Sequence, residues 1–91
     1  MENLPEKWNL VEEYEGNFIF ENDDQEFNVL INQMGRMEPP YEIAYQQLKG
    51  EFTKIGFDNG GYSSYAKNES HALHRAFEMM KFITATSSKM V

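Results

Sequence analysis

The stretch DQEFNVLINQMGR, residues 24–36, is predicted to form the first regular element after an acidic N-terminal region, so the order of the elements depends on its conformation. Its apolar residues recur at i, i+3, i+4 and i+7: Phe27, Leu30, Ile31 and Met34. This spacing is typical of an amphipathic helix with one buried stripe. Asp23 or Asp24 can cap the start of such a helix, and Gly35 suits its C-terminal end. We therefore expect a helix here.

Strands are expected in the middle of the chain. In EPPYEIAYQQLKG, residues 38–50, two prolines end the helix, and apolar residues from Tyr41 to Tyr45 alternate with others, as in a half-buried strand. EFTKIGFDNGG, residues 51–61, predicts a second strand closed by a hairpin turn. YSSYA, residues 62–66, predicts a third strand.

The C-terminal part has the most regular pattern. One helical face carries small and apolar residues: Ala72, Ala76, Met80 and Ile83, with Leu73 and Phe77 beside them. The opposite face is polar, and Asn68 is a natural N-cap. The order from residue 24 is thus α-β-β-β-α, an α+β fold in which a three-stranded antiparallel sheet packs against two helices.

The N-terminal region differs from the rest in charge. The net charge is −7, and residues 1–24 account for all of it with eight acids against Lys7. We therefore divide the chain into an acidic, aromatic extension, residues 1–23, and a domain, residues 24–91. Within the extension, NLPEKWNLVEEYEG predicts a short helix that ends at Gly16, and NFIFEN predicts an extended segment.

Three segments carry a resemblance to the double-stranded RNA-binding domain family: VLINQMGRMEPPYEI, GEFTKIGFDNGG and SYAKNESHALHRAFEMM. The similarity covers about two thirds of the chain, and PPYEI is its most telling point. It implies contact with duplex RNA through the first helix, the turn after the first strand and the start of the last helix. The family's lysine run is absent, and Glu69 stands at one of its positions.

The resemblance implies an RNA-binding set in this chain: Asn28, Asn32, Gln33, Lys49, Lys67 and Asn68. Because phosphate contacts dominate the affinity of such interfaces and few lysines remain, we expect binding of duplex RNA to be weak. Family members without the lysine run tend to act in protein interaction or dimerisation. We therefore expect a non-catalytic module that binds a protein partner or a second copy, with weak, shape-specific RNA binding as the alternative.

Aromatic residues of the extension are the candidates for a protein interface: Trp8, Tyr14, Phe18 and Phe20. Interface hot spots are enriched in Trp and Tyr, but the same residues could complete the domain's own core. Two further uses of the acidic residues stay open. They could compete with RNA for the remaining lysines, or they could mimic a nucleic acid and inhibit a basic protein.

The sequence gives no support for an enzyme. No phosphate-binding glycine loop or nucleophile elbow is present. His71, His74 and Glu78 share a helix face, but this is a weak metal motif, and we expect no metal or cofactor. Without cysteine, a long apolar run or a signal peptide, the expected location is cytoplasmic or nuclear, with no membrane association.

One alternative fold remains open. FNVLI, residues 27–31, could be a strand that continues NFIF, residues 17–20. Short apolar runs of this kind fit either a helix or a strand. This alternative gives a larger sheet with one helix.

Overall fold

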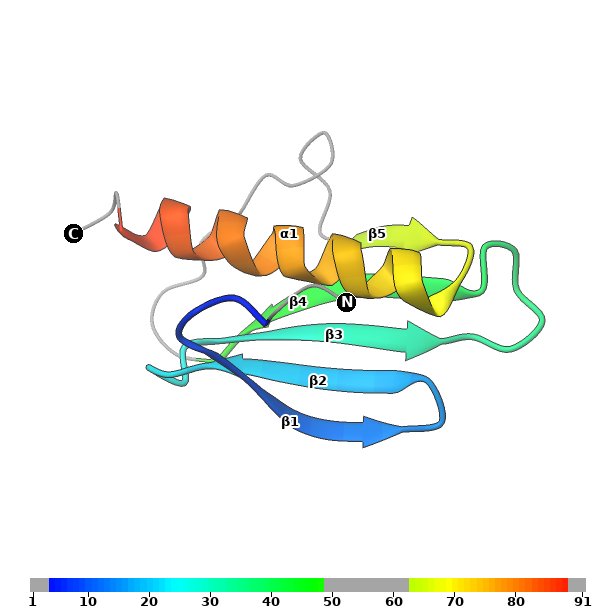
Figure 1. Ribbon diagram of the computed structural model, residues 1–91, viewed down its shortest axis with the longest axis horizontal. Coiled ribbons are helices and arrows are strands. Elements are labelled where there is room, and N and C mark those ends of the chain that lie inside the picture. The colour runs from blue at the N-terminus through cyan, green and yellow to red at the C-terminus, as the bar shows by residue number, and fades with distance from the viewer. Residues whose placement is uncertain (1–3, 49–62, 89–91) are drawn as a thin grey trace.

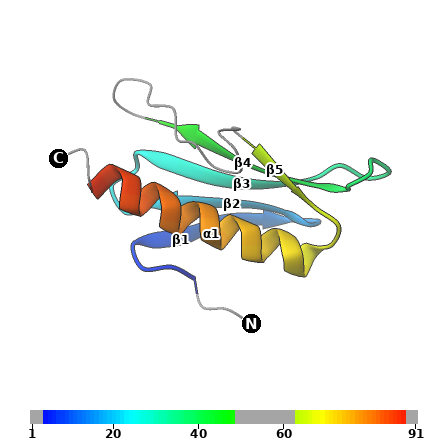
Figure 2. The same ribbon diagram turned by 90° about the horizontal axis from the view of Figure 1, so that it is seen from above.

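The computed structural model describes residues 4–48 and 63–88, which form a two-layer α+β structure (Figures 1 and 2). Its elements are β1 (Trp8–Tyr14), β2 (Asn17–Asn22), β3 (Phe27–Gln33), β4 (Tyr41–Gln47), β5 (Ser63–Ala66) and α1 (Glu69–Ser88). The strands form one antiparallel sheet in the order β1-β2-β3-β4-β5. Helix α1 lies across one face of this sheet (Figure 2).

The expected α-β-β-β-α order with three strands and two helices is wrong. The predicted first helix is the central strand β3, which pairs with both β2 and β4. The alternative, a larger sheet with one helix in which FNVLI is a strand, is confirmed for the described residues, but FNVLI pairs antiparallel with NFIF after a turn and does not continue it. The helical stripe would leave Val29 outside the core, whereas strand alternation buries Phe27, Val29 and Ile31 together. The β-branched residues Val29 and Ile31 also favour an extended backbone.

The short helix expected near the N-terminus is also wrong, because Trp8–Tyr14 forms β1. Gly16 does not end a helix. It forms a two-residue hairpin turn with Glu15, and both residues have positive φ angles, +47° for Glu15 and +82° for Gly16. Positive φ at both central positions is the signature of a type I′ turn, whose twist matches that of the flanking strands. The hairpin joins β1 to β2, so residues 8–22 belong to the same sheet as β3.

The turn between β2 and β3 explains why its aspartates cap no helix. The side-chain oxygen Oδ1 of Asn22 accepts hydrogen bonds from the backbone N–H groups of Glu26, at 2.8 Å, and Phe27, at 3.1 Å. Gln25 has a positive φ of 56° within this turn. The carboxamide thus satisfies the backbone of a tight connection and returns the chain antiparallel to β2.

The strand expected over the Tyr41–Tyr45 pattern, the strand predicted at YSSYA and the C-terminal helix are confirmed as β4, β5 and α1. Asn68 caps α1 as predicted: its Oδ1 accepts a hydrogen bond from the backbone N–H of His71 at 2.8 Å. The strand and hairpin predicted for residues 51–61 lie outside the described residues. No helix in the described part of the chain combines the length and the apolar character needed to cross a membrane.

The core lies between the sheet and α1. The sheet contributes aromatic and β-branched side chains, and α1 contributes small and flexible ones. The buried apolar residues are Trp8, Phe18, Phe20, Phe27, Val29, Ile31, Ile43, Tyr45, Ala66, Ala72, Ala76, Phe77, Met79, Met80 and Ile83. The alanines let the helix lie close to the strands, and Phe77 packs edge-to-face on Phe20 with ring centroids 5.9 Å apart.

Candidate functional site

The two faces of the sheet differ in what lies on them. Helix α1 packs over β3, β4 and β5 on one face, called here the covered face. On the other face, called here the open face, no other helix or strand of the described residues is packed. Side chains alternate between the two faces along each strand, so the registers assign the open face. It includes Asn9, Glu12, Tyr14, Asn17, Ile19, Glu21, Asn28, Leu30, Asn32, Glu42, Ala44, Gln46 and Tyr65.

The centre of the open face is apolar. Ile19 of β2 lies opposite Leu30 of β3, and Leu30 lies opposite Ala44 of β4. Each of the three side chains is half-buried. Cross-strand neighbours on one face are in contact distance, so these residues form a continuous apolar row across three strands.

Acidic and aromatic side chains border this row. Glu12 lies opposite Ile19 at one end. Glu42 lies opposite both Asn32 and Tyr65, and its Oε1 accepts a hydrogen bond from Asn32 Nδ2 at 3.3 Å. Tyr65 is 49% exposed. The open face therefore combines an apolar centre with carboxylates and an accessible aromatic ring.

The surface of the open face is hollowed at the β1–β2–β3 end. A depression of about 290 Å³ is lined by Glu12, Tyr14, Asn17, Ile19, Leu30 and Asn32. Tyr14, at its edge, is 66% exposed. A depression of this volume can take one large side chain of a partner, and its walls offer both apolar contact and a carboxylate.

The residues predicted to bind RNA are not brought together. Asn28 and Asn32 lie on the open face, but Gln33 points to the opposite side of β3 by strand alternation, because the predicted helical face does not exist. The Oδ1 of Asn28 is buried and has no hydrogen-bond partner within the described residues. Lys67 is exposed next to the cap residue Asn68, and Lys49 lies outside the described residues.

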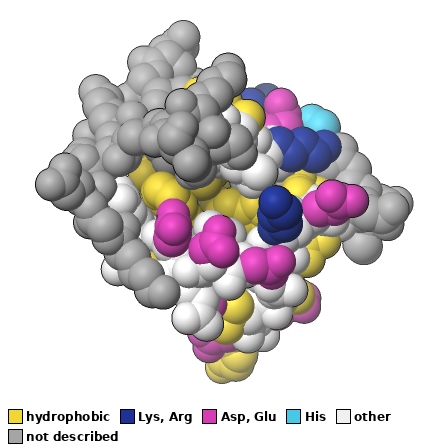
Figure 3. All heavy atoms as spheres, turned by 90° about the vertical axis from the view of Figure 1, so that its left-hand side faces the viewer, with side chains coloured by type: hydrophobic (Ala, Val, Ile, Leu, Met, Phe, Trp, Pro, Cys, Tyr) yellow, Lys and Arg dark blue, Asp and Glu magenta, His cyan; other side chains and the backbone are white. Residues whose placement is uncertain are grey.

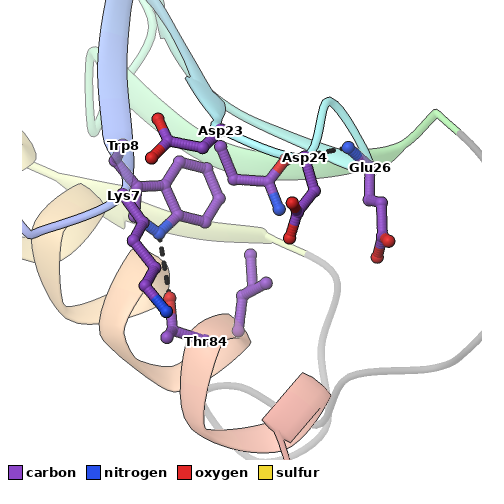
Figure 4. A pocket seen from close by; sticks show the side chains of 8 residues that line it. Lys7, Trp8, Asp23, Asp24, Glu26 and Thr84 are labelled. Carbon is purple, nitrogen blue, oxygen red and sulfur yellow. Dashed lines mark hydrogen bonds between the residues drawn. The ribbon is translucent and has the colours of Figure 1, made fainter.

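The four aromatic candidates for a protein interface have different positions. Trp8, Phe18 and Phe20 are buried on the covered face, where they complete the core. The indole N–H of Trp8 donates a hydrogen bond to Thr84 Oγ1 at 2.9 Å, which joins the start of β1 to the C-terminal half of α1 (Figure 4). Tyr14 is the one candidate of the four that is exposed.

The end of the molecule that contains the β2–β3 turn is rich in acids, and Figure 3 shows them around a partly visible apolar area. A cavity of about 90 Å³ here is lined by Lys7, Asp23, Asp24 and Glu26 next to Trp8 (Figure 4). Asp23 Oδ1 accepts a hydrogen bond from Asn9 Nδ2 at 2.8 Å. These carboxylates stand beside a lysine and within a turn, so the cavity does not resemble a binding site for a cation.

The histidines of α1 do not form a metal centre. His74 Nε2 lies 3.0 Å from Glu78 Oε1, one turn further along the helix, and both side chains are about half exposed. Across residues 4–48 and 63–88, no group of three or more His, Cys, Asp or Glu side chains is placed to hold a metal ion.

The prediction from sequence missed the main residues of the open face. The helical pattern places Leu30 in a core stripe, and Ile19 and Tyr65 lie in an extended segment and a strand for which the sequence predicts no site. The sequence pattern that identifies these residues is the alternation of side chains along a strand, with a period of two residues. In NFIFEN and FNVLINQ the residues between the core positions share the opposite face.

Comparison of the chain with models of protein families, with curated proteins and with solved structures finds no match in any of the three.

Proposed function

We propose that this protein is a non-catalytic interaction module that binds a protein partner through the open face of its sheet. The observation that carries this proposal is the apolar row Ile19–Leu30–Ala44, which no described helix covers although it lies in the middle of the sheet. A row of half-buried apolar side chains ringed by polar ones has the composition of an interface core with its rim.

Charge on the open face indicates the chemistry of the partner. Glu12, Glu21 and Glu42 lie on this face, and no Lys or Arg lies on it among the described residues. Complementary charge favours encounter with a basic surface and disfavours an acidic one. The same argument disfavours a second copy of this chain, face to face, and it disfavours nucleic acid, whose affinity depends on phosphate contacts.

Binding of duplex RNA receives less support. The family mechanism places a first helix in a minor groove, and residues 27–33 of this chain form a strand instead. At the start of α1, Glu69 follows the cap residue Asn68, and its carboxylate repels phosphate. Mimicry of a nucleic acid is also less well supported, because the three acids of the open face alternate with amide and apolar side chains.

The test uses a photo-crosslinker in two matched positions. We expect p-benzoylphenylalanine in place of Tyr65 to cross-link a protein partner in cells, and the same group in place of Phe82, an exposed position on α1, to cross-link none. The partner, once purified, should bind the protein about tenfold more weakly after Leu30→Asp and with unchanged affinity after Phe82→Ala. Equal cross-linking from both positions, or unchanged binding by Leu30→Asp, would contradict the proposal.

A second experiment, with duplex RNA, distinguishes the proposed protein binding from RNA binding. A labelled duplex of about 20 base pairs exceeds the footprint of a double-stranded RNA-binding domain. We expect no change in its fluorescence anisotropy at low salt. Salt-sensitive binding that Lys67→Glu abolishes would favour the RNA function instead. We also propose a cytoplasmic or nuclear location, with which the lack of cysteine is compatible.

A further inference from the structure

Strand β1 is an edge of the sheet formed by the described residues. Among the described residues it pairs with β2 alone, and it has seven residues, whereas β5 at the other edge has four (Figure 1). Every side chain of β1 after Trp8 is exposed. An edge strand presents unpaired backbone N–H and C=O groups along its outer side, where an extended segment of another chain can pair.

Two cavities lie on either side of β1. The depression on the open face includes Glu12 and Tyr14. On the covered face, a second cavity of about 270 Å³ lies between β1 and the N-terminal half of α1, and its walls include Leu10, Glu13 and Leu73. Leu4 also lines this cavity, and Leu10, Glu13 and Glu69 at its border are exposed. Since side chains of a strand alternate between faces, neighbouring residues of an added strand would enter the two cavities.

Each cavity combines apolar walls with carboxylates. On the open face, Glu12 stands beside Ile19 and Leu30. On the covered face, Glu13 and Glu69 stand beside apolar side chains. A Lys or Arg side chain fits such a site, because its aliphatic stem covers apolar surface and its charged end reaches a carboxylate. Strand β1 has no basic residue of its own, and Lys7, just before it, lines the separate cavity next to Trp8.

The same charges argue against a second copy of this chain at β1. Antiparallel pairing of two β1 strands would bring the glutamates of both copies together, and like charges on facing strands are destabilising. The register of β1 with β2 also shifts between Leu10 and Glu12. The irregularity ends before Glu12, because Glu12, Glu13 and Tyr14 pair with β2 in regular register.

We propose that β1 accepts an extended basic segment of a partner protein as a sixth strand, with two consecutive Lys or Arg residues at Glu12 and Glu13. One basic side chain enters the depression with Glu12, and the next enters the cavity with Glu13 and Glu69. Flanking apolar residues contact Leu10 and Tyr14. This inference rests on the proposed function for the premise that the module binds protein, and it adds the class of segment and the mode of binding.

The probe is a fluorescent peptide of about nine residues with a central Arg-Arg pair flanked by Val and Thr, long enough to pair with all 7 residues of β1. We expect binding by fluorescence anisotropy, and weaker binding as salt rises. A peptide with Glu-Glu at the centre should not bind. Failure of the Arg-Arg peptide to bind at about 1 mM would overturn the proposal.

Two double variants test the role of the glutamates beside the cavities. Each replaces two glutamates by glutamine, so both change the net charge equally. Glu12→Gln/Glu13→Gln should weaken binding at least about tenfold, since it removes two charge-assisted contacts. Glu26→Gln/Glu78→Gln changes two exposed acids that line neither cavity, and it should leave affinity within about twofold. Equal weakening by both variants would mean general attraction to an acidic protein and would overturn the proposal.

Backbone pairing is tested by methylating the peptide at alternate amide nitrogens. A strand added to an edge uses the N–H groups of every second residue, so one methylated isomer should lose binding and the other should keep it. Equal binding of the two isomers would rule out strand addition. A dimer in sedimentation equilibrium that the peptide cannot dissociate and that Glu12→Gln/Glu13→Gln strengthens would identify a second copy as the occupant instead.

The two proposals can fail separately. Cross-links from position 65 with no peptide binding at β1 would leave the open-face function and remove strand addition. Peptide binding that depends on Glu12 and Glu13, without cross-links from position 65, would leave strand addition and remove the role of the open face.

Discussion

The covered and open faces of the sheet are built by the same strands and differ in almost every physical property. On β3, Val29 and Ile31 are fully buried under α1, while their neighbour Leu30 is half-buried on the open face. The covered face has large apolar side chains without acids at its centre. The open face has a narrow apolar row between carboxylates and amides.

This difference separates residues that stability requires from residues that are accessible to a partner. Removing a fully buried side chain leaves a cavity, so the covered face is constrained by stability. A half-buried side chain loses less on truncation, and its exposed part is available to a partner. The open face can therefore keep Ile19 and Leu30 accessible with little loss of stability. For this reason we infer that the binding surface is the open face and not the covered face.

The largest expected effect is a difference in stability between variants of two adjacent residues of β3, one on the covered face and one on the open face. We expect Ile31→Ala to lower the free energy of unfolding by about 2–5 kcal/mol, because Ile31 is fully buried between β3 and α1. The matched change Leu30→Ala should cost less, about 1 kcal/mol, since that side chain is only partly buried. Denaturant unfolding of both variants measures the difference. Equal losses would mean that the open face is as tightly packed as the covered one.

An intermediate effect is expected where β1 is joined to α1. Thr84→Val removes the acceptor of the Trp8 indole N–H and leaves a buried donor unpaired. This should destabilise the protein by about 1–3 kcal/mol. Thr86→Val is the control, because it makes the same change about half a helical turn away. If the two variants unfold at the same denaturant concentration, the contact between Trp8 and Thr84 does not hold β1 against the helix.

The smallest effect is expected at the rim of the open face. Tyr65→Ala should change the free energy of unfolding by less than about 0.5 kcal/mol, because the ring is exposed and has few contacts to lose. Thermal and denaturant unfolding both report this value. A loss above about 1 kcal/mol would place Tyr65 in the structural core of the molecule and would weaken its assignment to a binding surface.

Local patterns predicted the elements in which one periodicity fits clearly. The alternation from Tyr41 to Tyr45 gave β4, and the apolar stripe with the Asn68 cap gave α1. Residues 27–33 satisfy both periods, because Phe27 and Ile31 are buried in a helix or a strand. The predicted RNA-binding set depends on whether residues 27–33 are a helix or a strand. A helix places Asn28 and Gln33 on one face, whereas a strand places them on opposite faces.

Local sequence is enough to predict the strand at β4 and the capped helix α1, and it shows the acidic residues 1–24 and the lack of cysteine directly. Tertiary contacts make residues 27–33 a strand and bury Trp8, Phe18 and Phe20 in the core. The physical reason is that pairing with β2 and β4 satisfies the backbone on both sides of β3 and buries Val29, which a helix would leave outside the core. No local pattern contains those partners, because they come from segments on either side in the chain.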